Sequence, residues 1–134
     1  MTAYALVRLA HVVIAVVGLG TITAIAVVAR ASRGTPPAGV GRLAAWATIC
    51  LALMLATGVT LDLVADRAFD EAWWFRIAVL SMVPAGAALG RIRGLARRWA
   101  AGEPEVGGPI ARTAWVASAL VAWIAVLMEL RPFA

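Results

Sequence analysis

Residues 9–29, LAHVVIAVVGLGTITAIAVVA, decide the fold, because these 21 residues between Arg8 and Arg30 contain no charged side chain. At about 1.5 Å of rise per residue, a helix of this length covers the roughly 30 Å hydrocarbon core of a bilayer. The segment therefore predicts a transmembrane helix. It contains the only histidine of the chain, His11, which shares a face with small residues such as Gly18. A face of this kind favours contact with other helices.

The composition excludes an ordinary soluble domain. Of the 134 residues, 63% are hydrophobic and 14% are charged, and so small a core leaves much of that apolar surface facing outward. The net charge of +5 comes from arginines in short loops, not from a basic domain, so we expect a lipid bilayer and no nucleic acid as partner. The use of Arg without any Lys is typical of a GC-rich genome, and the lone Cys50 excludes a disulfide framework.

Three further apolar segments predict three more spans, and the third is the least regular. Arg76 leaves few uncharged residues before Arg91, so this span is counted from Trp73 at the aromatic sequence Trp73-Trp74-Phe75. The fold class expected is all-α, an integral membrane four-helix bundle of two helical hairpins in a single domain, 1–134. The expected helices are about 6–29, 43–62, 73–90 and 113–130, with loops 30–42 and 91–112. The first part of loop 91–112 is expected to be a short amphipathic helix on the membrane surface.

Arginines predict the orientation of the bundle. Loops 30–42 and 91–112 hold eight of the twelve arginines, and basic residues are enriched in cytoplasmic loops. We therefore expect both loops to be cytoplasmic and both termini, with the acidic connector that begins after Asp62, to face outward.

Four polar residues are expected near the outer boundary of the membrane: His11, Asp62, Arg76 and Glu129. One interpretation is a polar pocket in which His11 binds haem iron or a metal, or exchanges protons with Glu129. The other is structural, with Arg76 paired to Glu129 or Asp62. Met128 lies at the same depth and is the candidate second metal ligand beside His11.

Short motifs in all four helices resemble small four-helix bacterial membrane proteins. The motifs are Leu6-Val-Arg-Leu-Ala-His11 with Gly18 and Gly20, Thr57-Gly58, Trp73-Trp74-Phe75-Arg76 and Leu127-Met-Glu-Leu-Arg-Pro132. They are similar to the copper-resistance D type (CopD), to the HemJ-type protoporphyrinogen oxidases and to allied uncharacterised families. This resemblance implies haem or metal at His11, and Arg76 as the counterpart of a third-helix lysine. The chain has no second histidine and no tryptophan before the first-helix glycines, so an uncharacterised relative is the better match.

Two classes of function follow. The first is a non-catalytic membrane subunit or assembly partner in a bacterial inner membrane, forming homo-oligomers or joining other membrane subunits through faces such as the GxxxG pair Gly86 and Gly90. The alternative is a haem- or metal-associated redox protein, with haem b as candidate cofactor, His11 as ligand, and Arg76 and Glu129 as its neighbours.

Overall fold

The computed structural model describes residues 2–32, 34–103 and 105–130. It contains four α-helices, α1 (Ala3–Ala31), α2 (Val40–Val64), α3 (Trp73–Ala100) and α4 (Gly107–Leu130). Each helix is long enough to cross a membrane, and the mean hydropathy of its best 18-residue window is 2.6, 2.0, 1.4 and 1.8 in chain order. The chain is therefore an all-α, polytopic membrane protein with four candidate spans, as its apolar segments predicted.

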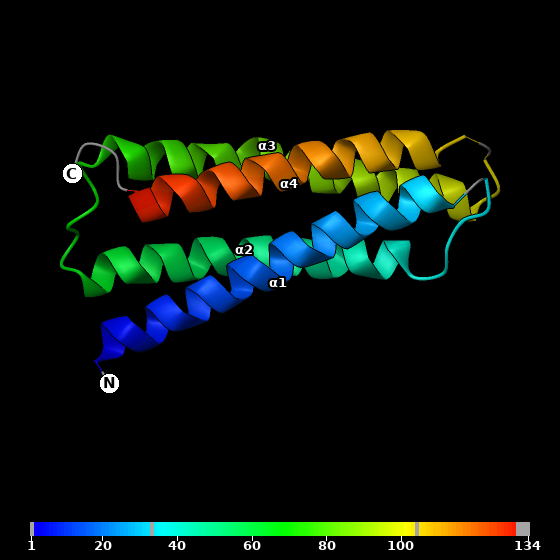
Figure 1. Ribbon diagram of the computed structural model, residues 1–134. Helices are drawn as coiled ribbons and strands as arrows, with labels where there is room; N and C mark the ends of the chain where they lie inside the picture. Colours follow the sequence, from blue (N-terminus) through cyan, green and yellow to red (C-terminus); the bar gives the residue numbers. More distant parts are fainter. Residues whose placement is uncertain (1, 33, 104, 131–134) are drawn as a thin grey trace.

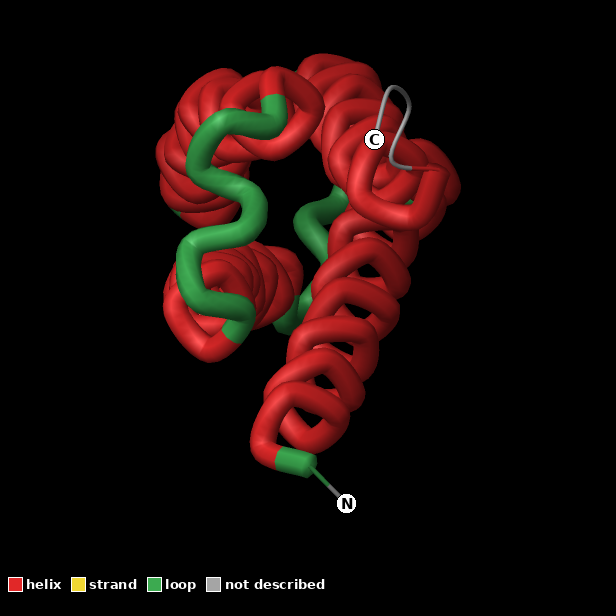
Figure 2. Tube along the Cα trace, turned by 90° about the vertical axis from the view of Figure 1, so that its left-hand side faces the viewer, coloured by secondary structure: helices red, strands yellow, loops and turns green. Residues whose placement is uncertain are grey.

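The helices form two hairpins that pack into a four-sided bundle (Figures 1 and 2). Within the described residues, α1 contacts α2 and α4, α3 contacts α4 and α2, and neither diagonal pair is in contact. The start of α1, the end of α4 and connector 65–72 lie at one end of the bundle, which we call the termini end (Figure 1). The loops between α1 and α2 and between α3 and α4 lie at the opposite, arginine-rich end. Arg33, Arg131 and Pro132, used above for orientation and resemblance, lie outside the described residues.

Small residues occupy the centre of the bundle. Alanines are fully buried on every helix, including Ala26, Ala44, Ala78 and Ala114. Helices in lipid gain little from burying apolar surface against each other, so close backbone approach over small residues is what holds them together. The buried share of each candidate span is 28–33%, and large apolar side chains cover the outside. The outer surface is thus suited to lipid.

Helix α3 differs from its expected bounds, because it continues past Gly90 to Ala100 and α4 begins at Gly107. The segment after Gly90 is amphipathic as expected: Ile92 and Trp99 are buried, while the arginines between them point outward. It is a continuation of α3 and not a separate helix on the membrane surface. The buried side prolongs the stripe that α3 packs against the bundle, so the helix runs on until the turn at Gly102, where φ is 91°.

Candidate functional site

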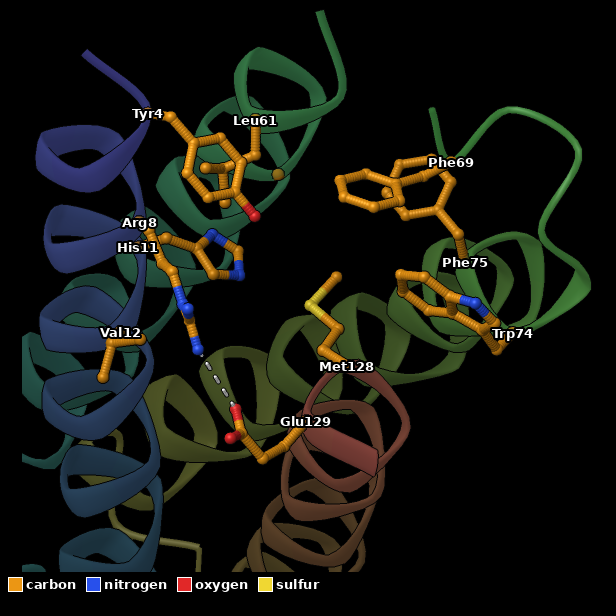
Figure 3. Close-up of a pocket in the computed structure, with 11 residues that line it drawn as sticks. Tyr4, Arg8, His11, Val12, Leu61, Phe69, Trp74, Phe75, Met128 and Glu129 are labelled. Atoms are coloured by element: carbon orange, nitrogen blue, oxygen red, sulfur yellow. Dashed lines mark ion pairs between the residues drawn. The ribbon is translucent and has the colours of Figure 1, made fainter. Parts of the chain in front are cut away.

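A cavity of about 80 Å³ lies at the termini end of the bundle, between the start of α1 and the end of α4. Figure 3 shows His11 and Met128 projecting into it from opposite sides. The cavity combines an imidazole, a thioether, an ion pair and several aromatic rings. Its lining consists of Tyr4, Arg8, His11, Val12, Gly58, Leu61, Phe69, Trp74, Phe75, Met128 and Glu129.

The imidazole of His11 is oriented by Thr57 of α2. His11 Nδ1 lies 2.6 Å from Thr57 Oγ1, and that hydroxyl donates its single hydrogen to the carbonyl oxygen of Leu53 at 2.7 Å. In the tautomer with the proton on Nδ1, the hydroxyl oxygen accepts from His11 while the hydroxyl hydrogen goes to Leu53, so both hydrogen bonds form. In that tautomer, neutral His11 keeps its lone pair on Nε2. This is the arrangement by which a metal-binding histidine is held in place through its other ring nitrogen.

Gly58 provides the room for this imidazole. A Cβ atom built on Gly58 would lie 3.5 Å from His11 Cε1, with no other neighbour within 4 Å. A methyl group would just fit there, but any larger side chain would displace the ring. Thr57 thus holds His11 by a hydrogen bond, and Gly58, which has no side chain, leaves room for the imidazole ring.

Arg8 and Glu129 form an ion pair beside the cavity. Arg8 Nη2 lies 3.8 Å from Glu129 Oε2, and both side chains are exposed, so the pair joins α1 to α4 only weakly (Figure 3). The structural interpretation of Glu129 was an ion pair with Arg76. Glu129 is paired, but with Arg8, which lies one helical turn before His11 and on the same side of α1.

Arg76 does not reach the cavity. Its side chain points to the outside of α3, where Nε donates to the carbonyl oxygen of Asp70 at 3.0 Å. No ion pair between Arg76 and Asp62 or Glu129 occurs among the described residues. The reason is geometric: Arg76 is three residues into α3, on the face turned away from α1 and α4.

Asp62 is buried and organises the connector between α2 and α3. Its Oδ1 accepts a hydrogen bond from the backbone N–H of Phe69 at 2.9 Å, and its own carbonyl oxygen accepts from Arg67. A hydrogen bond from the Asp70 carboxyl to Asp62, together with loss of solvent and the like charge, raises the pKa of Asp70. Asp62 therefore stabilises the fold of connector 65–72. Its side chain is not part of the cavity lining.

Aromatic rings form the wall of the cavity opposite α1. The ring centroids of Phe69 and Trp74 lie 5.5 Å apart and those of Trp74 and Phe75 lie 6.0 Å apart, within the range of favourable aromatic pairs. The sequence predicted Trp73, Trp74 and Phe75 as a group at headgroup depth. Trp73 is exposed in this way, whereas Trp74 is buried and faces the bundle.

The size of the cavity limits what it can hold. A volume of about 80 Å³ is well below the roughly 300–1,000 Å³ of pockets that hold cofactor-sized ligands, so a porphyrin does not fit between these helices as they stand. A single ion does fit. Apart from the residues left undescribed, no group of three or more His, Cys, Asp and Glu side chains converges anywhere in the chain. The donors at hand are therefore His11 Nε2 and the Met128 sulfur.

Sequence reasoning quoted Thr57 and Arg8 within motifs but assigned neither of them a role in this site. The spacing of Arg8 and His11 contains a signal, because residues three apart share one side of a helix. Thr57 carried no such signal, since its pairing with His11 depends on how α1 and α2 rotate against each other. No family model, no curated protein and no solved structure matches this chain.

Proposed function

We propose that this chain is a small non-catalytic subunit of a protein complex in a bacterial inner membrane. It assembles with a second copy of itself or with other membrane subunits through the outer face of α3. This proposal starts from the four candidate spans. It rests on one observation, the row of small residues that α3 turns away from its own bundle.

Glycines inside the bundle are explained by close contacts. A Cβ atom on Gly18 would lie 3.0 Å from Cys50 Cβ, and one on Gly107 would lie 3.0 Å from the carbonyl oxygen of Ala29. On α3, by contrast, Cβ atoms on Gly90 and Gly94 would meet nothing within 4 Å. Nothing within the bundle requires a glycine at these two positions.

Gly90, which is exposed, and Gly94, which is partly buried, form an outer stripe of small residues with the exposed Ala87. These three residues recur every three or four positions, and the stripe ends at the exposed Val83. Glycine in a helix costs about 1 kcal/mol relative to alanine, and a small-residue stripe lets a second backbone approach closely. Gly20 of α1 is equally open, but large exposed side chains such as Val16 and Val27 flank it. The stripe on α3 is therefore the better contact surface for another helix.

The test is cysteine cross-linking in native membranes. Gly90→Cys should form a disulfide-linked species on mild oxidation, whereas the matched control Gly20→Cys should not, and the native Cys50 is buried in both variants. A product of twice the chain mass identifies a second copy, and a product of any other mass identifies another subunit with a cysteine at the contact. Gly90→Leu should abolish the complex without unfolding the chain. Equal cross-linking at positions 20 and 90, or none at either, would refute assembly through α3.

A second candidate function, binding of a soft metal ion such as Cu(I), is favoured by the state of His11. With the proton on Nδ1 and bonded to Thr57, Nε2 is left with a lone pair, and the Met128 thioether lines the same cavity. Thioether and imidazole ligands together suit copper. Arg8 and Glu129, which also line the cavity, form an ion pair and together add no net charge to it.

Metal binding is tested by dialysis of the purified protein against Cu(I) followed by elemental analysis. We expect one equivalent of copper, lost in His11→Ala and in Met128→Leu and retained in the control Met82→Leu, whose sulfur lies outside this lining. An absorption spectrum before and after reduction checks for haem. Copper retained without His11, or no copper at all, would overturn this candidate.

A further inference from the structure

A groove of about 550 Å³ lies between α3 and α4 near the arginine-rich end, away from the His11 cavity. Two arginines, Arg91 of α3 and Arg112 of α4, line it together with Ala87, Ala88, Thr113 and Val116. It thus combines cationic groups from two helices with a floor of small apolar side chains.

Both arginines lie at the depth of a membrane boundary. On α3, about 27 Å of helix separates Trp73, the first residue, from Arg91. On α4, about the same length separates Arg112 from Leu130, the last residue. These lengths match the roughly 30 Å hydrocarbon core. If Trp73 and Leu130 mark one surface, then both guanidinium groups reach the headgroup layer of the other surface, and Ala87, Ala88 and Val116 lie on its hydrocarbon side.

No ion pair among the described residues neutralises the two arginines of this groove. Within residues 2–32, 34–103 and 105–130, neither Arg91 nor Arg112 forms an ion pair with an acidic side chain. Arg98 shows the contrast, because its Nη2 lies 2.6 Å from Glu103 and this contact lowers the pKa of Glu103. Glu105 lies outside the groove, in a neighbouring hollow that is also lined by Arg30 and Arg112.

We propose that the groove binds one anionic phospholipid. Its phosphate lies between Arg91 and Arg112, which supply N–H donors from two helices, and an acyl chain lies over Ala87, Ala88 and Val116. Arginine forks match phosphate geometry, and basic pockets between membrane helices favour anionic headgroups. The bilayer that these helices span supplies this ligand at high local concentration, so the occupant is a membrane lipid and not free phosphate.

This inference goes beyond the proposed assembly function and concerns the edge of α3 that faces α4. Gly90 does not line the groove, although Ala87 borders both surfaces. Gly90→Leu should therefore leave lipid binding unchanged, and removal of Arg91 and Arg112 should leave the Gly90→Cys cross-link unchanged. The two proposals can fail separately.

The test is native mass spectrometry of the full chain released from detergent, titrated with phosphatidylglycerol or with phosphatidylcholine of the same acyl chains. We expect one phosphatidylglycerol to bind, and binding about fivefold weaker in Arg91→Gln or Arg112→Gln and about twenty-five-fold weaker in the double variant. The matched control is Arg93→Gln with Arg97→Gln, which removes two charges from α3 that do not line the groove. The double control should bind as the parent does.

Each other outcome overturns the proposal. Equal binding of phosphatidylcholine would remove the role of charge, and full competition by inorganic phosphate at millimolar concentration would indicate a free-anion site. Equal losses in the control would indicate a general charge effect. The double variant Arg91→Lys with Arg112→Lys keeps both positive charges and should bind phosphatidylglycerol more tightly than the double Gln variant does. Circular dichroism of each variant checks that the helices are still folded.

Discussion

At the scale of single residues, the most informative contact is the one between His11 and Thr57. His11 is buried, and its Nδ1 lies in hydrogen-bond contact with Thr57 Oγ1 at 2.6 Å. Hydrogen bonds between membrane helices contribute about 0.6–1.7 kcal/mol, and an N–H left without an acceptor adds a further cost. This one contact therefore both stabilises the α1–α2 pair and orients the imidazole towards the cavity.

We expect Thr57→Val to lower the free energy of unfolding by about 1–2 kcal/mol, because it removes the side-chain hydrogen bond between Thr57 and the buried His11. Unfolding in mixed detergent micelles, followed by circular dichroism, measures the change. Thr60→Val is the control, since Thr60 lies on the same helix and donates its hydroxyl to the carbonyl oxygen of Ala56 within that helix. If both variants were equally stable, the His11 contact would have no energetic role.

The same scale corrects the expected ionic pairs. Glu129 pairs with Arg8, and Arg76 bonds to the backbone of Asp70. Both pairings depend on side-chain direction around a helix, which residue depth alone does not specify. The depth of His11, Met128 and Glu129 was a good guide, because all three line one cavity.

At the scale of elements, α1 and α2 approach each other closely where Gly18 faces Cys50. A Cβ atom on Gly18 would come within 3.0 Å of Cys50 Cβ, whereas one on Gly20 would meet nothing within 4 Å. Gly18 and Gly20 therefore differ in direction: Gly18 faces α2, and Gly20 points away from the bundle.

We expect Gly18→Ala to cost about 1–3 kcal/mol of stability through overpacking, and Gly20→Ala to be neutral or stabilising by up to about 1 kcal/mol through helix propensity. Thermal unfolding in detergent distinguishes the two. Adding Cys50→Gly to Gly18→Ala should recover part of the loss, because the two Cβ atoms no longer meet. A loss of equal size at Gly20 would contradict this account of the α1–α2 contact.

At the scale of the whole molecule, the two ends of the bundle differ in charge and in the kind of site they carry. The termini end holds the His11 cavity and an acidic connector, and the opposite end holds the arginine groove. Basic residues are retained on the cytoplasmic side of membrane proteins. The arginine groove is therefore expected at the cytoplasmic leaflet.

We expect Glu71→Cys, in the connector, to react with a membrane-impermeant maleimide in intact cells, and Ala38→Cys, in the loop between α1 and α2, to react only after permeabilisation. Both positions are exposed. Cys50 is buried and serves as the background signal in the parent chain. The reverse pattern would show that arginine distribution misassigns the orientation of this protein.

The sequence by itself determined that the helices lie in lipid, that the fold is all-α, and that the helices pair into hairpins. These properties follow from apolar segments long enough to span a bilayer and from the arginine-rich loops between them, which are local features of the chain. The tertiary structure decided the rest: that Thr57 holds His11, that Arg8 and not Arg76 pairs with Glu129, and that Arg91 and Arg112 share a groove. The physical reason is that such contacts depend on how each helix is rotated and tilted against its neighbours, and that rotation is set by the packing of small residues from all four helices at once.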